Sequence, residues 1–159
     1  MNAGVHTNIL NGLIDATMDS ARHYRRVAGS IDNPRIRALF EHLSVQRKMV
    51  AEELLDQLAA AGGGSLREGM RLTHASHIFG NLRHAMNYGY CALIDEVERG
   101  EEHIKAKYEH ALEDGGLSGL PRTAVLNAYE SVREDGRRMH SLKCYPNTEH
   151  GHGEALQQW

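Results

Sequence analysis

The stretch 34-PRIRALFEHLSVQRKMVAEELLDQLAAAGGG-64 is one long amphipathic segment that is followed directly by three glycines. Its apolar residues recur at alternating steps of three and four, the period of a helix that buries one stripe: Ile36, Leu39, Phe40, Leu43, Val50, Leu54 and Leu58. Asp32-Asn33 supplies an N-cap oxygen, and Pro34 suits the first helical turn. Glycine loses the most backbone entropy in a helix, so the helix should end near Ala61.

Three further segments repeat this period: about 8–31, Tyr90–Asp114, which is closed by Gly115-Gly116, and the segment from Pro121 toward Pro146. Residues 65–89 show this apolar period less clearly, and they predict one short amphipathic helix around Ile78–Met86. Short connections make consecutive helices antiparallel, whereas this long one lets the chain return to its starting end. The sequence predicts an all-α protein: a ferritin-like four-helix bundle over 1–145, with one long crossover between helices two and three, and a flexible polar tail over 146–159.

Composition excludes several classes of protein. Hydrophobic residues make up 41% and charged residues 25%, as in ordinary globular domains. The net charge of -3 argues against a nucleic-acid surface, and no apolar run reaches the roughly 20 residues of a membrane span. We therefore expect a cytoplasmic protein. Cys91 and Cys144 are then expected as reduced thiols, with a disulfide between them as the alternative.

Several short boxes resemble a bacterial ferritin-like family of unknown function. They are Leu10-Asn11-Gly12-Leu13-Ile14 with Asp19 and Tyr24, Leu39-Phe40-Glu41, Gln46-Arg47, Ala51-Glu52-Glu53-Leu54, Glu98-Arg99-Gly100-Glu101, Tyr108, Ala111-Leu112 and Tyr129-Glu130. The resemblance covers residues 8 to about 143. It implies a ferritin-like bundle and no established activity.

The di-iron site that such bundles carry looks degraded in this chain. Ferritin-like di-iron proteins place a glutamate on each of two helices and Glu-x-x-His on each of the other two. Here Glu-x-x-His occurs only at Glu149–His152, in the tail. The resemblance implies an acidic residue near Ala21 and a histidine at Gly136, and both are missing. At the middle of the bundle only helix three is expected to offer carboxylates.

The candidate metal ligands are Glu98, Glu101, Glu130 and His140, which could hold iron or manganese in an atypical site. A buried carboxylate needs a neutralising partner, so ion pairing to Arg47, Arg133 or Lys105 is the favoured alternative. His140 alone is more typical of a structural histidine, and His150 with His152 would capture metal adventitiously.

Two functions remain open at this stage. The first is a non-catalytic structural or interaction module that forms a homo-oligomer, expected to be a dimer, because Val45, Met49 and Val50 widen the apolar stripe of helix two. The second is a metal-binding protein, an iron or manganese oxidase or store, with an atypical carboxylate site. The residues favour the first and leave enzymatic activity undecided.

Overall fold

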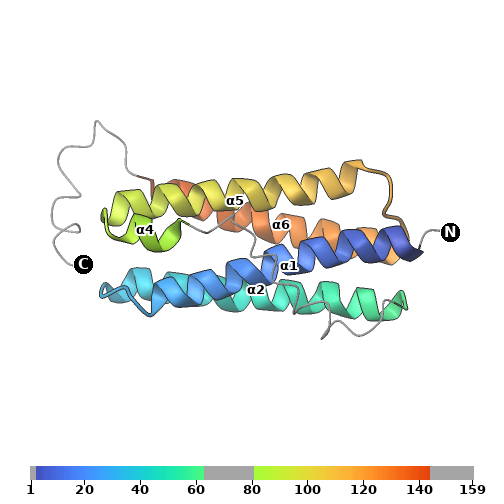
Figure 1. Ribbon diagram of the computed structural model, residues 1–159, viewed down its shortest axis with the longest axis horizontal. Helices are drawn as coiled ribbons and strands as arrows, with labels where there is room; N and C mark the ends of the chain where they lie inside the picture. The colour runs from blue at the N-terminus through green and yellow to red at the C-terminus, as the bar shows by residue number, and fades with distance from the viewer. Residues whose placement is uncertain (1–2, 63–80, 144–159) are drawn as a thin grey trace.

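The computed structural model describes residues 3–62 and 81–143. Over these residues the chain forms five helices and no strand: α1 (Ala3–Ala28), α2 (Pro34–Ala60), α4 (Leu82–Met86), α5 (Tyr90–Glu113) and α6 (Gly119–Ser141). Four of them are long and lie side by side, and short α4 lies beside the start of α5 (Figure 1). The predicted all-α class is confirmed.

Local signals in the sequence set the bounds of α2. The side-chain oxygen of Asn33 accepts hydrogen bonds from the backbone N–H groups of Arg35, at 3.0 Å, and Ile36, at 3.3 Å. These bonds satisfy donors that the first helical turn leaves free. After Ala60 the chain reaches Gly62, whose φ of 75° is a conformation that glycine adopts without steric strain. The predicted cap at Asn33 and stop at the glycine run are confirmed.

Contacts between helices fix their directions. The Thr17 and Tyr108 hydroxyls lie 2.7 Å apart, and the Tyr24 hydroxyl donates to the Glu101 carboxylate. Later residues of α1 therefore contact earlier residues of α5, so these helices are antiparallel. A connection of five residues, 29–33, makes α1 and α2 antiparallel as well. It follows that α2 and α5 run in the same direction, so α2 ends and α5 begins at opposite ends of the molecule (Figure 1).

The helices α5 and α6 form the second antiparallel pair. Glu98 contacts His140, and Tyr129 donates a hydrogen bond to Glu109 at 2.7 Å. The helix α1 packs on α2 and α5, and α6 packs on the same two helices, so the four long helices enclose one core. Its largest apolar side chains include Tyr24, Phe40, Leu43, Leu54, Ile104 and Tyr108, all with no exposed surface.

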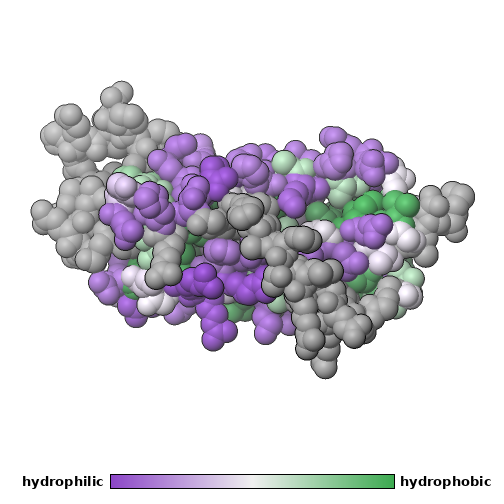
Figure 2. Space-filling model, viewed as in Figure 1, coloured by the Kyte–Doolittle hydropathy of each residue, from purple (hydrophilic) through white to green (hydrophobic). Residues whose placement is uncertain are grey.

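Hydrophilic residues cover much of the described outer surface in the view of Figure 2, while hydrophobic surface gathers around the start of α1. No helix in the described ranges is long and apolar enough to cross a membrane. The structure corrects one part of the predicted outer strip, since Val50 belongs to the core with 7% of its surface exposed. Val45 and Met49 do lie on the outside, 59% and 57% exposed.

The predicted helix bounds are close to the observed ones. The helix α1 begins at Ala3 and ends at Ala28, earlier than predicted at both ends, because residues 29 and 30 form a turn. The last helix begins at Gly119, just before the predicted Pro121. Leu82 and Met86 lie in α4 as predicted, whereas most of the predicted crossover and the tail lie outside the described residues.

The cysteines differ from the expectation of reduced thiols. Cys91, in the first turn of α5, is disulfide-bonded. Cys144, the other cysteine of the chain, lies outside the described residues. The predicted cytoplasmic location stays a prediction.

Candidate functional site

The centre of the bundle holds a cluster of three charged side chains, which we call the central cluster: Arg47 from α2, Glu101 from α5 and Asp135 from α6. Arg47 has no exposed surface, and the two acids are 2% exposed. The guanidinium Nη2 of Arg47 contacts Glu101, and its Nε lies 3.2 Å from Asp135 Oδ2. One cation therefore joins carboxylates from two other helices in the interior.

The positions of these residues follow from helical spacing. Arg47 lies in the buried stripe of α2, one turn after Leu43 and one turn before Val50. Asp135 similarly lies between Val132 and Met139 in the buried stripe of α6. Residues three or four apart share a helix face, so each polar residue is carried inward by its apolar neighbours.

Burial shifts the pKa values of all three groups. The pKa of Glu101 is raised well above its usual value, first by burial and then by the charges of Asp135 and Glu102. Burial also raises the pKa of Asp135, although Arg47 opposes this shift, and burial lowers the pKa of Arg47. With both acids ionised the cluster would carry an uncompensated negative charge in a medium of low dielectric, which favours the protonated form of Glu101.

Hydroxyl groups of α1 complete the polar interior. Tyr24 donates to Oε1 of Glu101, and its ring centroid lies 5.9 Å from the guanidinium carbon of Arg47. Thr17 donates to the backbone oxygen of Leu13 at 2.6 Å and shares a hydrogen bond with Tyr108. Burial raises the pKa of Tyr108 to about 12, so its hydroxyl stays protonated. Together these contacts satisfy polar groups that would be costly to bury alone.

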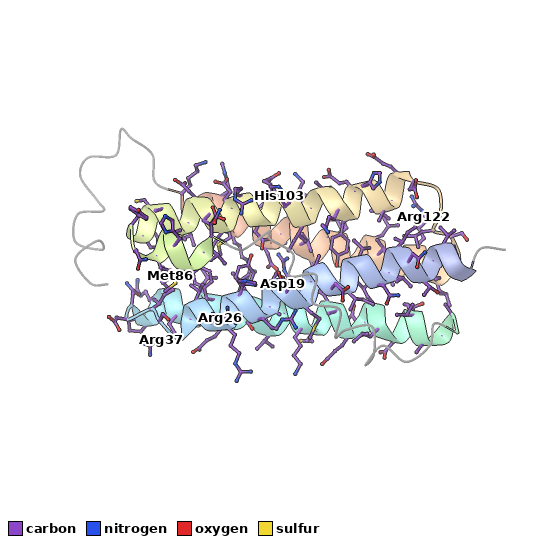
Figure 3. All side chains as sticks on the ribbon, in the orientation of Figure 1. Asp19, Arg26, Arg37, Met86, His103 and Arg122 are labelled. Atoms are coloured by element: carbon purple, nitrogen blue, oxygen red, sulfur yellow. The ribbon has the colours of Figure 1, made fainter. Side chains whose placement is uncertain are left out.

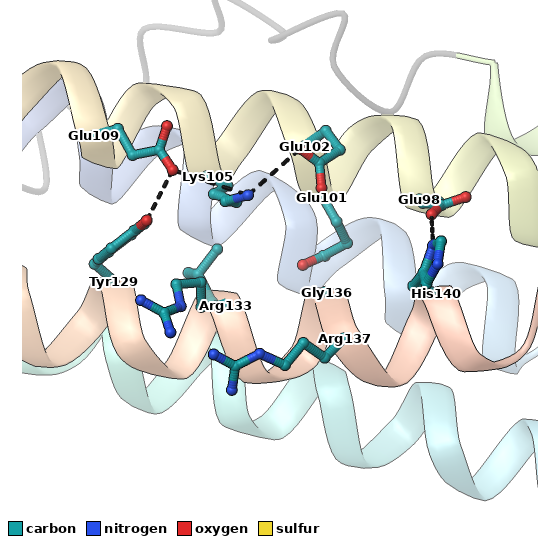
Figure 4. A pocket seen from close by; sticks show the side chains of 11 residues that line it. Glu98, Glu101, Glu102, Lys105, Glu109, Tyr129, Arg133, Gly136, Arg137 and His140 are labelled. Carbon is teal, nitrogen blue, oxygen red and sulfur yellow. Dashed lines mark hydrogen bonds and ion pairs between the residues drawn. The ribbon is translucent and has the colours of Figure 1, made fainter.

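A groove of about 400 Å³ opens between α5 and α6, and Glu101 of the central cluster lies in its lining (Figure 4). Its lining is mainly charged: Glu98, Glu101, Glu102, Lys105, Glu109, Tyr129, Val132, Arg133, Gly136, Arg137 and His140. Glu101 reaches from α5 toward α6 beside Gly136, and a Cβ added at Gly136 would meet no atom within 4 Å. The missing side chain of Gly136 thus contributes to the open space.

The structure separates the four predicted metal ligands. Glu98 and His140 contact each other at the rim of the groove, and Lys143 Nζ lies 2.9 Å from the other Glu98 oxygen. Glu101 instead belongs to the central cluster. Glu130 is 62% exposed and lies 3.4 Å from Arg133. Within 3–62 and 81–143, no three His, Cys, Asp or Glu side chains come together as a group that could hold a metal ion.

Of the three partners predicted for the carboxylates, Arg47 alone enters the central cluster. Lys105 lies 3.7 Å from Glu102 and 3.9 Å from Glu109, both on its own helix. The prediction that only helix three offers a carboxylate at mid-bundle is wrong, because Asp135 of α6 is there too. The sequence did contain a signal for this carboxylate. Asp135 follows Val132 by three residues and precedes Met139 by four, so it lies in the buried stripe of α6.

The helices and the central cluster define an all-helical protein whose polar interior is joined by an internal ion pair. The comparison with known families agrees with the resemblance to a family of unknown function. A model described as "Domain of unknown function (DUF2383)" matches residues 6–114, more than half of the chain, and the chain belongs to this family. The match includes Tyr24, Arg47 and Glu101 and ends before α6. No curated protein and no solved structure matches the chain significantly.

Proposed function

We propose that the chain is a ferritin-like bundle without a catalytic metal centre, which serves as a structural or interaction module and assembles as a homo-oligomer. The absence of a metal centre is supported most directly by Arg47, whose guanidinium lies fully buried between Glu101 and Asp135. A guanidinium at mid-bundle pairs with the carboxylates that a metal ion would otherwise bind.

The ferritin-like assignment is supported by helix direction. An up-down-up-down bundle alternates the direction of every consecutive helix, whereas ferritin-like folds have one long connection between parallel helices. Among the residues that the structure describes, α2 and α5 are the second and third long helices, and they run in the same direction. This is the arrangement that one return along the bundle produces.

The side chains at mid-bundle do not fit a di-metal centre. Such a centre uses four carboxylates and two histidines from four helices. At the level of the central cluster, α1 supplies Tyr24, α2 supplies Arg47, and α5 and α6 supply one carboxylate each. Two acids that share one buried guanidinium form a poor site for two divalent ions, so we derive no metal chemistry at this centre.

Metal titration tests this proposal. We suggest Fe(II) under anaerobic conditions and Mn(II), added to the full chain carrying His150→Ala and His152→Ala, which removes the tail histidines as adventitious ligands. The expected result is no stoichiometric uptake by calorimetry at micromolar metal. Uptake of one or more ions per chain that is lost in Glu101→Gln would overturn the proposal.

A second candidate function, metal binding at the rim of the groove, rests on the contact between Glu98 and His140. A carboxylate and an imidazole from facing helices are two of the ligands that a divalent ion needs. Uptake in the same titration that is lost in His140→Ala and retained in Glu101→Gln would support this candidate instead.

A further inference from the structure

The outward face of α2 carries a regular row of exposed side chains, which we call the outer seam. Its members are spaced alternately by three and four residues along the whole helix and all are exposed: Arg35, Ala38, His42, Val45, Met49, Glu52, Asp56 and Ala59. The seam lies on the side of α2 opposite Arg47 and Leu54, which face the core. Figure 3 shows the side chains of α2 that project away from the other helices.

Alternating steps of three and four mark a single helix face, and two such faces pack together in a coiled coil where apolar residues occupy them. The two large apolar residues of α2 that are exposed, Val45 and Met49, lie at the centre of the seam. The remaining members are small or charged. The outer seam exposes little apolar surface, so its fit to a partner depends on the order of its charged residues.

The order of the charges is self-complementary. If a second α2 is placed antiparallel with its Met49 opposite Val45, the two-fold axis also sets Met49 opposite the second Val45. His42 then faces Glu52, and Ala38 faces Asp56, where the small side chain leaves room for Arg35 to approach that carboxylate. A parallel arrangement would instead place each charged residue next to its own copy.

We propose that the outer seam is the contact of a two-fold symmetric homodimer, in which two α2 helices pair antiparallel about Val45 and Met49. The inference rests on the proposed homo-oligomer and names the surface and the register that form it. Basic residues at the start of α2 and acidic residues near its end then attract across the interface at both ends. The 27 residues of α2 give the pair a length of about 40 Å.

Sedimentation equilibrium of the full chain tests the surface. The wild type should have twice the monomer mass of 17.7 kDa at micromolar concentration. Val45→Glu places a carboxylate against Met49 of the second copy and should weaken the dimer at least tenfold. The matched control is Leu126→Glu on α6, which is 41% exposed and lies outside the seam, and it should remain dimeric. Circular dichroism confirms that each variant is folded.

Charge exchange tests the register. Arg35→Glu alone and Asp56→Arg alone should each weaken the dimer, because like charges then meet at both ends. The double variant Arg35→Glu/Asp56→Arg restores opposite charges only in the antiparallel arrangement and should recover most of the affinity.

The outcomes distinguish this inference from the proposal on which it rests. A wild type that is monomeric at 100 µM overturns both. A stable dimer that survives Val45→Glu and dissociates with Leu126→Glu overturns the seam and leaves the homo-oligomer standing. A dimer that Val45→Glu dissociates but that the double charge exchange fails to restore overturns the antiparallel register.

Discussion

The central cluster and the rim of the groove both pair a glutamate of α5 with basic side chains, but in different surroundings. In the cluster, Glu101 and Asp135 meet Arg47 with almost no exposed surface. At the rim, Glu98 meets His140 and Lys143, which are 61% and 38% exposed. Water screens the rim, whereas the interior leaves each charge dependent on its partner. Burial therefore decides how much an ion pair contributes to the free energy of unfolding. Variants of the two regions should differ accordingly.

Arg47→Met is expected to have the largest effect. It removes the cation and leaves two carboxyl groups facing each other in the core, which should lower the free energy of unfolding by about 3–5 kcal/mol at pH 7. Urea unfolding followed by circular dichroism measures it. The control Arg137→Met removes a pair with Glu134 in which both side chains are more than half exposed, and it should change stability by less than about 1 kcal/mol. Equal losses would contradict the comparison.

The pH dependence of stability should reveal the proton on Glu101. Because the folded-state pKa of Glu101 is raised, the folded chain binds more protons than the unfolded chain at pH values above the usual glutamate range. The contribution of Glu101 is therefore fully present below its unfolded pKa and is lost as pH rises through its folded pKa. Glu101→Gln imitates the protonated acid and should remove this loss.

The measurement is the difference in unfolding free energy between Glu101→Gln and the wild type at several pH values. As pH increases, the variant should become more stable relative to the wild type. Glu130→Gln is the control, since its side chain is 62% exposed and its charge is not among those that raise the pKa of Glu101. A difference that does not change with pH would show that Glu101 is ionised in the folded protein.

Gly136→Ala should stabilise the chain by about 0.5–1 kcal/mol. Glycine within a helix loses more backbone entropy than alanine, and the added methyl group would enter open space in the groove. Gly12→Ala in α1 is a matched control, because it is also a helical glycine with nothing within 4 Å of the added carbon, and it should give a similar gain. Destabilisation by Gly136→Ala alone would mean that the groove closes in solution.

Glu98→Ala should have the smallest effect, a loss of about 0.2–1 kcal/mol, because its partners are solvated. Burial opposes the shift, but hydrogen bonds to His140 and Lys143 and their charges leave the pKa of Glu98 lowered. The loss should be measured by urea unfolding at pH 7 and should fall in 1 M salt, which screens exposed charges. A loss as large as that for Arg47→Met would place Glu98 energetically with the central cluster.

The sequence by itself determined the helices and their ends. The 3-4 period of apolar residues, the Asn33 cap and the glycine runs are local features, and local hydrogen bonding and backbone entropy act on them directly. The sequence also predicted that a buried carboxylate would need an internal cation, and it named Arg47 among three candidates.

Only the tertiary structure decided which carboxylates are buried. Glu98 and Glu101 are three residues apart on one face of α5. The apolar stripe of that helix therefore does not show which of the two is buried. Glu101 turns inward because Tyr24 of α1 and Arg47 of α2 meet it, and Arg47 is in turn held by Asp135 of α6. A charge is stable in the core only where partners from distant parts of the chain converge, and that convergence depends on the packing of all four helices.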